Sequence, residues 1–142
     1  MKNFKKILLP VDGSKSSLLA KKNAIAMASA MDADLLLLYV ADTIPAFITG
    51  QPKEEAIRAQ QEEADQILAP YRQFLLEHKV NHDERITPGA NAGDTICKIA
   101  REERCDLIVM GSRGLGEWEG AMVGSVTNRV LAQCGIPVLV VR

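Results

Sequence analysis

Residues 111–125, G-S-R-G-L-G-E-W-E-G-A-M-V-G-S, contain five glycines directly after an apolar run. Glycine has no Cβ, so the backbone can approach a ligand closely, and several backbone N–H groups pointing inward bind phosphate oxygens well. Arg113 adds a cation, and Ser125 adds a hydroxyl near the start of the next expected helix. The segment predicts a phosphate-binding loop; the alternative is a flexible surface turn.

A carboxylate follows the first apolar run of the chain, in the stretch P-V-D-G-S at 10–14. Taken alone, an aspartate in such a turn is more often a cap or turn residue than a binding residue. Asp12 becomes a candidate ligand contact if the fold brings its turn opposite the glycine segment.

Two well-known phosphate motifs are absent. A Walker A loop requires lysine after its second glycine, and Glu117 stands at that position after Gly116. A dinucleotide-binding G-x-G-x-x-G motif would follow the first strand, where only Gly13 occurs, and a motif starting at Gly114 would need glycine where Glu119 stands. Neither a P-loop hydrolase nor a nicotinamide-dependent dehydrogenase is supported.

Short apolar runs alternate with segments of helical periodicity. The expected strands cover residues 5–11, 35–40, 81–87, 105–110 and 137–141, and the expected helices cover 16–31, 54–79, 91–103 and 123–134. Residues 41–53 contain two prolines and a glycine, and we expect them to form a loop long enough to act as a flap.

This βαβαβαβαβ order predicts an α/β fold, a five-stranded parallel sheet with helices on both faces and strand order 3-2-1-4-5. No linker or internal repeat divides residues 1–142, so we expect one Rossmann-like nucleotide-binding domain. In such sheets, ligands bind at the carboxyl ends of the strands where the winding reverses. With the first and fourth strands adjacent at that point, the turn carrying Asp12 meets the glycine segment.

Composition excludes several classes of function. A formal net charge of −1 gives no long-range attraction to nucleic acid or to anionic lipid, so we expect neither as a partner. No window reaches the ~20 apolar residues of a membrane span, and the apolar run after the N-terminal lysines is too short for a signal peptide. We expect a soluble, cytoplasmic protein.

The three cysteines, Cys97, Cys105 and Cys134, are odd in number and show no C-x-x-C spacing. A disulfide framework or a metal site is therefore not expected. The interpretation that follows is three small buried side chains in a reducing compartment.

The spacing Gly111-x2-Gly114-x9-Gly124-Ser125 resembles the G-2x-G-9x-G-[ST] signature of the universal stress protein family. The stretches P-V-D-G-S (10–14), D-L-I-V-M-G-S-R-G (106–114) and P-V-L-V-V (137–141) resemble that family too, so the likeness extends over essentially the whole chain. It implies a nucleotide-binding α/β fold and a homodimer paired through the final strand, Pro137 to Val141. It also implies ATP with a divalent cation, Mg²⁺ or Mn²⁺, as the ligand.

The resemblance also implies roles for individual residues. Pro10, Val11 and Asp12 would border adenine and ribose, with Asp12 accepting from a ribose hydroxyl or reaching the metal through water. Val40 would contact adenine. Met110 and Gly111 would line the ribose side, and Gly114, Gly124 and Ser125 would hold the phosphates with Arg113 nearby. The chain departs from the usual pattern at E-W-E (117–119), where small or basic residues are more common.

Three functions follow from these observations. The first is an ATP-binding regulatory protein of the stress response, a nucleotide-sensing dimer with at most slow ATP hydrolysis. The second is a dimeric interaction scaffold that binds no nucleotide and uses Glu117, Glu119 and the apolar flap for protein contacts. The third, a phosphotransferase or hydrolase with rapid turnover, lacks a recognisable general base or P-loop lysine.

Overall fold

Strands and helices alternate through the chain. The computed structural model describes residues 3–113 and 123–142. Its strands are β1 (Lys6–Val11), β2 (Asp34–Ala41), β3 (His82–Pro88), β4 (Leu107–Gly111) and β5 (Val138–Val141). Its helices are α1 (Lys15–Met31), α2 (Gly50–Glu77), α3 (Ala92–Glu102) and α4 (Ser125–Gln133).

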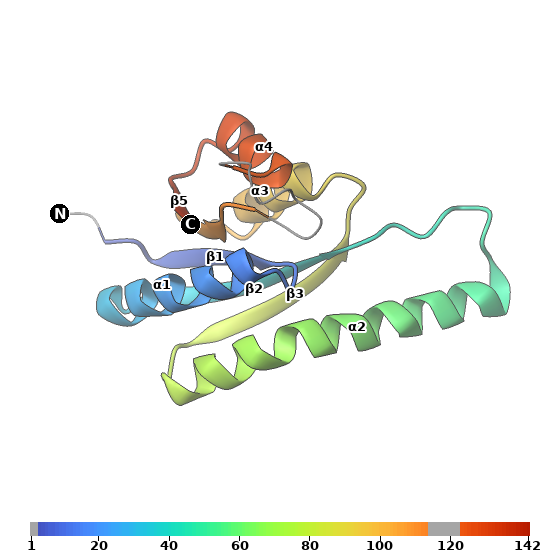
Figure 1. Cartoon of the computed structure of the whole chain (residues 1–142), viewed down its shortest axis with the longest axis horizontal. Helices are drawn as coiled ribbons and strands as arrows, with labels where there is room; N and C mark the ends of the chain where they lie inside the picture. Colours follow the sequence, from blue (N-terminus) through green and yellow to red (C-terminus); the bar gives the residue numbers. More distant parts are fainter. Residues whose placement is uncertain (1–2, 114–122) are drawn as a thin grey trace.

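The strands form one parallel sheet in the order β3-β2-β1-β4-β5. Helices α1 and α2 cover one face of this sheet, and α3 and α4 cover the other (Figure 1). The predicted fold class and strand order are therefore confirmed. Strands β1 and β4 are neighbours, as the expected binding site requires.

The two faces of β1 explain why its sequence is almost entirely apolar. Ile7 and Leu9 belong to the core shared with α1 and α2, whereas Leu8 belongs to the core shared with α3 and α4. All three side chains are completely buried, as is usual for a central strand of a parallel sheet. Strand β3, with the polar sequence H-D-E-R-I-T-P, lies at the edge, as predicted.

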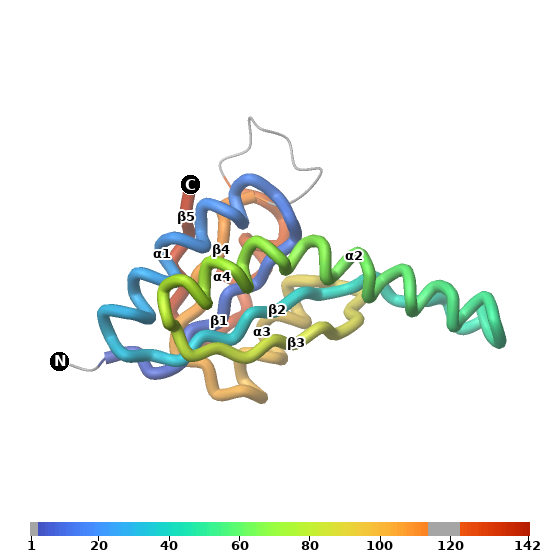
Figure 2. Tube along the Cα trace, turned by 90° about the horizontal axis from the view of Figure 1, so that it is seen from below, coloured from blue at the N-terminus to red at the C-terminus, as the bar shows by residue number. Residues whose placement is uncertain are grey.

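Helix α2 begins at Gly50, four residues before its expected start at 54, so the expected flap is shorter than residues 41–53. Pro52 lies in the first turn of the helix. Backbone N–H groups in the first turn have no intrahelical partner, so a proline, which has no N–H, is tolerated there. Residues 42–49, which include Pro45, form the predicted loop, whereas Gly50 and Pro52 belong to the helix. The first half of α2 extends beyond the sheet (Figure 2).

Polar caps fix where α1 and α3 begin. The Ser14 hydroxyl accepts a hydrogen bond from the Ser17 N–H at 3.1 Å, and the Asn91 side chain accepts one from the Asp94 N–H at 3.0 Å. Such caps satisfy N–H groups that have no partner within the helix. The cap of α1 therefore sets the position of the turn that follows β1.

The end of β4 lies against the start of α1. A Cβ built on Gly111 would approach the Ser16 carbonyl carbon to 2.5 Å and its carbonyl oxygen to 2.7 Å, and it would also overlap the Ser16 hydroxyl. Real Cβ atoms do not come this close to a backbone. Glycine at this position therefore permits the contact between β4 and α1.

Tyr71 anchors α2 beside the same region. Its side chain is fully buried, and its hydroxyl lies 2.7 Å from the Ser17 hydroxyl. Burial raises the pKa of the Tyr71 hydroxyl from 10.0 to about 12; the nearby Asp12 carboxylate acts in the same direction, and the hydrogen bond with Ser17 acts in the opposite one. A neutral Tyr71 is thus favoured by the folded state.

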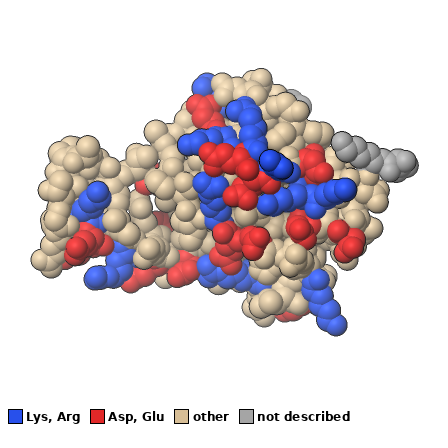
Figure 3. All heavy atoms as spheres, turned by 180° about the vertical axis from the view of Figure 1, so that it is seen from behind, with Lys and Arg blue, Asp and Glu red and all other residues tan. Residues whose placement is uncertain are grey.

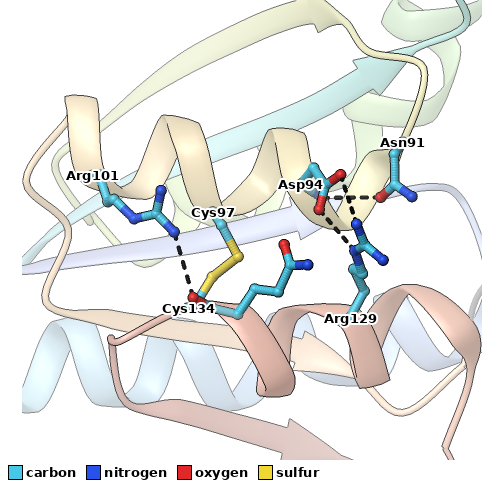
Figure 4. Close-up of a disulfide and its surroundings, with 7 residues drawn as sticks. Asn91, Asp94, Cys97, Arg101, Arg129 and Cys134 are labelled. Carbon is cyan, nitrogen blue, oxygen red and sulfur yellow. Dashed lines mark hydrogen bonds and ion pairs between the residues drawn. A yellow bond between two sulfur atoms is a disulfide. The ribbon is translucent and has the colours of Figure 1, made fainter.

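The prediction that all three cysteines are free is wrong. Cys97 of α3 and Cys134, which follows α4, form a disulfide with their Cα atoms 5.4 Å apart (Figure 4). Cys105 is free and buried. The two bonded cysteines are 37 residues apart, and they meet only because α3 and α4 pack side by side, which sequence spacing does not reveal.

We predict that Gly111→Ala destabilises the fold by about 1–3 kcal/mol, because the added methyl group must push α1 away from β4. The matched control is Gly135→Ala, where an added Cβ meets nothing within 4 Å and the expected change is within about 0.5 kcal/mol. Urea denaturation measures both. Equal midpoints for the two variants would contradict the close-contact explanation.

We predict that stability falls as the pH rises from 10 to about 12, because the folded state holds the Tyr71 proton more tightly than the unfolded state does. The stabilisation is fully present below pH 10 and amounts to about 2–3 kcal/mol for a shift of this size. Tyr71→Phe removes this contribution. The difference in unfolding free energy between wild type and variant should be constant below pH 9 and shrink above pH 10; a difference that stays constant up to pH 12 would refute the explanation.

Candidate functional site

A pocket opens at the carboxyl ends of β1 and β4. Residues from four regions form it: the ends of the central strands β1, β2 and β4, the start of α1, one side of α3, and the beginning of α4. Its described lining residues are Pro10, Val11, Asp12, Ser17, Leu38, Val40, Ala92, Ile96, Met110, Gly111, Arg113, Val126 and Thr127. This is the sheet edge where ligands bind in folds of this class.

Hydrogen bonds hold the two predicted turns against each other. The Ser14 hydroxyl donates to the Arg113 carbonyl oxygen at 3.4 Å, and the Arg113 N–H donates to the Ser16 hydroxyl at 3.2 Å. Ser14 and Ser16 are both 8% exposed, so these bonds are largely shielded from water. The turn that carries Asp12 therefore faces the beginning of the glycine segment, as the sequence predicted.

Asp12 has a structural contact as well as a place in the pocket wall. Its Oδ1 accepts a hydrogen bond from the Ser14 N–H at 2.9 Å, and Gly13 between them has a φ of +83°, a conformation that favours glycine. The Asp12 N–H donates to the Ser17 hydroxyl at 3.4 Å. The turn interpretation of D-G-S is thus correct, and it places the carboxylate at the pocket.

The opposite side of the pocket is held by α4 and the residue that follows β4. The Thr127 hydroxyl donates to the Gly111 carbonyl oxygen at 2.8 Å. The Gly124 N–H donates to the Ser112 carbonyl oxygen at 2.6 Å, and the Ser112 N–H donates to the Val141 carbonyl oxygen at 2.8 Å. These bonds fix the first turn of α4 relative to the end of β4.

Most of the predicted site residues are brought together. The pocket is lined by Pro10, Val11, Asp12, Val40, Met110, Gly111 and Arg113. Gly124 and Ser125 do not line it; Gly124 is the N-cap of α4, and Ser125 is an exposed residue in its first turn. Gly114 and residues 117–119 lie outside the described residues.

Several lining residues were not among the predicted site residues: Ser17, Leu38, Ala92, Ile96, Val126 and Thr127. Ile96 and Val126 read as ordinary inward positions of amphipathic helices, and nothing in the sequence separates core from pocket wall there. Thr127 carried a signal, since it is a hydroxyl residue near the start of the helix after the glycines. Ser17 carried none, because its partner Tyr71 is 54 residues away.

The pocket combines apolar walls with a few polar groups, the usual composition of a site for a small organic ligand. Asp12 is the one carboxylate among its described lining residues. Across residues 3–113 and 123–142, no group of three or more His, Cys, Asp or Glu side chains could hold a metal ion. Within the same ranges, no helix is long and apolar enough to cross a membrane.

Charged side chains on the face shown in Figure 3 are of mixed sign. Arg72 bonds both Glu84, at 2.7 Å, and Asp65, at 2.9 Å. Lys6 lies 3.2 Å from Glu103, and the ammonium group of this lysine is the main reason that the pKa of Glu103 is lowered. Among the residues that the structure describes, Figure 3 shows positive and negative side chains interleaved on this face and no patch of a single sign.

Comparison with known proteins identifies the family. The model described as "Universal stress protein family" matches residues 3–142. A universal stress protein of Methanocaldococcus jannaschii is 36% identical over 143 residues, which cover 98% of this chain and 82% of that protein. The solved structure of universal stress protein UspA from Lactobacillus plantarum has a TM-score of 0.86 and 28% identity, and it covers 100% of both chains.

A further solved structure, of a universal stress protein in complex with cAMP, has a TM-score of 0.72 and 27% identity, covering 99% of this chain and 98% of that one. The fold, the family match over nearly the whole length and these relatives agree. The chain belongs to the universal stress protein family.

Proposed function

We propose that this protein binds ATP together with Mg²⁺ or Mn²⁺ in the pocket at the ends of β1 and β4, and that it acts in the cytoplasm as a nucleotide-responsive regulatory homodimer. One observation carries the proposal: the hydrogen bonds of Ser14 and Ser16 with Arg113 hold the acidic turn against the glycine segment. The pocket between these turns has an apolar part and a polar part that suit the two ends of a nucleotide.

The apolar part suits a purine base. Leu38 and Val40 come from β2, Met110 ends the apolar run of β4, and Ile96 and Val126 come from the helices on the other side. Apolar side chains in a pocket wall bind an aromatic ring by removing it from water. Asp12, which lines the same pocket, would accept a hydrogen bond from a ribose hydroxyl.

The polar part suits the phosphates. Helix α4 is capped by Gly124, which has no side chain to bond the N–H groups of the first turn, and helix N-termini attract anions. Arg113 lines the pocket on the side of the glycine segment. In this proposal the phosphates extend past the pocket lining to the start of α4, next to Val126, where Gly124 and Ser125 hold them together with Gly114, and Arg113 lies beside them.

A divalent cation fits this site only as part of the nucleotide complex. Mg²⁺ commonly keeps several waters and is held by one or two carboxylates plus the phosphates of the substrate. Asp12 is the described pocket carboxylate that could take this part, through water, while its Oδ1 accepts from the Ser14 N–H. The cation would neutralise phosphate charge next to Asp12.

The relatives support the proposal in a coarser form. A universal stress protein of the same fold, 27% identical to this chain, was solved in complex with cAMP, which shares the adenine and ribose of ATP. Membership of that family and the position of the pocket favour an adenine nucleotide over other phosphate ligands. We propose at most slow hydrolysis, arising from the metal and the backbone groups alone.

Titration of the purified protein with ATP and Mg²⁺ by calorimetry tests the proposal. We predict that Asp12→Asn weakens binding about 10–100-fold, the equivalent of losing one hydrogen bond to a charged group. Asparagine keeps the Oδ1 acceptor for Ser14, so the turn should remain folded.

Asp83→Asn is the matched control, because Asp83 is an exposed residue of the edge strand β3 and does not line the pocket. Its affinity for ATP should equal that of wild type. If the wild-type protein does not bind ATP, ADP, AMP or cAMP at millimolar concentration, the nucleotide proposal fails and the scaffold without nucleotide becomes the better explanation.

We propose pairing of two copies through β5, an edge strand whose residues Val138–Val141 are all half-buried. An edge strand has backbone groups that a symmetric partner can bond. We predict that Val140→Lys shifts the protein from dimer to monomer in sedimentation experiments, because a charge would enter the interface. Leu131→Lys, on an exposed position of α4, should leave the dimer intact; a wild type that is monomeric at all concentrations would disprove the pairing.

A further inference from the structure

One wall of the pocket is a pair of helices joined by a covalent bond. Ala92 and Ile96 of α3 line the pocket, and so do Val126 and Thr127 of α4. Cys97 directly follows Ile96 on α3, and it is bonded to Cys134 at the end of α4 (Figure 4). The disulfide therefore links the two helices that form this wall.

Non-covalent contacts also join α3 and α4. Near the pocket, a Cβ built on Gly93 would lie 2.7 Å from Arg129, and Arg129 forms two hydrogen bonds with Asp94, at 2.8 and 3.1 Å (Figure 4). Both side chains of this ion pair are nearly half exposed, and such pairs contribute little to stability. At the far end, Arg101 donates to the Gln133 carbonyl oxygen at 3.5 Å, which is a weak bond.

The disulfide is a covalent connection between two helices that also share an apolar core, in which Val126 and Val130 of α4 pack with Ile96 and Ile99 of α3. Closing a loop of 37 residues stabilises a fold by about 3–4 kcal/mol in the chain-entropy model. In a reducing compartment such as the one proposed for this protein, disulfides that do form are usually transient and sense the redox state.

We propose that reversible reduction of the Cys97–Cys134 disulfide lowers the affinity of the pocket for adenine nucleotide, so that the redox state of the cell controls nucleotide binding. This inference rests on the proposed function and adds regulation to the same site. Reduction removes the covalent bond between the helices, so that α4 can shift relative to α3, and Thr127 of α4 holds the Gly111 carbonyl oxygen at the end of β4. Part of the binding energy is then spent in ordering the wall again.

The chemistry requires a dithiol as the reductant. Cys97 is 2% exposed, whereas Cys134 is partly exposed, so the thiolate of the dithiol attacks the Cys134 sulfur. The bond between the two protein sulfurs breaks, and Cys97 leaves as a thiolate and takes up a proton. The second thiol of the reductant then attacks the mixed disulfide, which releases Cys134 as a thiol and the reductant as a disulfide. Reaction with an oxidised dithiol runs the same steps in reverse.

Cys105 takes no part in this exchange. It is buried, and burial is the main cause that raises the pKa of its thiol to about 11. A thiol with so little thiolate is a poor nucleophile. Thiol titration of the denatured chain should accordingly find one thiol in the oxidised protein and three after reduction, out of three cysteines in the sequence.

The test compares ATP–Mg²⁺ affinity of the oxidised and the dithiothreitol-reduced full chain by calorimetry, at a temperature well below the melting temperature of both forms. We expect the reduced form to bind about fivefold or more weakly, the range of ordinary coupling between sites. The double variant Cys97→Ser with Cys134→Ser should bind like the reduced wild type and should not respond to dithiothreitol. Cys105→Ala, which keeps the disulfide, should respond as wild type does.

A second measurement needs no variant. Half-reduction of the disulfide occurs at a certain ratio of reduced to oxidised dithiothreitol. Because coupling is reciprocal, saturating ATP should raise this ratio by the same factor by which reduction weakens ATP binding. Equal affinity in both redox states, or a half-reduction point indifferent to ATP, overturns the inference while leaving the proposed function intact. Absence of ATP binding in either state overturns both.

Discussion

The contact between the end of β4 and the start of α1 is the constraint on which the pocket depends. Adjacent parallel strands bring the two turns to the same sheet edge, but adjacency alone does not fix how the turns face each other. The absence of a Cβ at Gly111 lets the Ser16 backbone approach, and Ser14 then serves two purposes. Its hydroxyl caps α1 by accepting from the Ser17 N–H, and it donates to the Arg113 carbonyl oxygen. One side chain therefore holds the start of the helix next to the glycine segment.

The two sides of the pocket are built from different kinds of interaction. On the side of α1, close backbone packing and largely buried hydrogen bonds hold the turns, and Tyr71 supports them from α2 through Ser17. On the side of α3 and α4, the helices share an apolar core, and an exposed ion pair, a weak hydrogen bond and a disulfide connect them as well. Of the contacts on the second side, the disulfide is the one that forms or breaks with the redox conditions around the protein.

The sequence was sufficient to predict the topology, because the patterns that identify strands and helices are local. Apolar runs such as L-L-L-L identify central strands, and the order of strands and helices leaves few possible arrangements. It was insufficient where contacts join distant residues: the Cys97–Cys134 bond and the Ser17–Tyr71 pair depend on how helices pack. The sequence predicted that Gly111 lets a ligand approach the backbone. The structure shows that its missing Cβ also makes room for the backbone of Ser16.

Helix α2 illustrates how unevenly one element can be supported. Its buried residues, Ala64, Leu68, Tyr71 and Leu75, all lie in the second half, and the first half projects past the sheet. Side-chain burial is what gives most helices in proteins their stability. The first half therefore opens at a small fraction of the free energy needed to unfold the sheet. Amide hydrogens along this single helix should form a gradient of exchange rates, fast near Arg58 and slow near Tyr71, and a protease could cut the exposed half while the sheet stays folded.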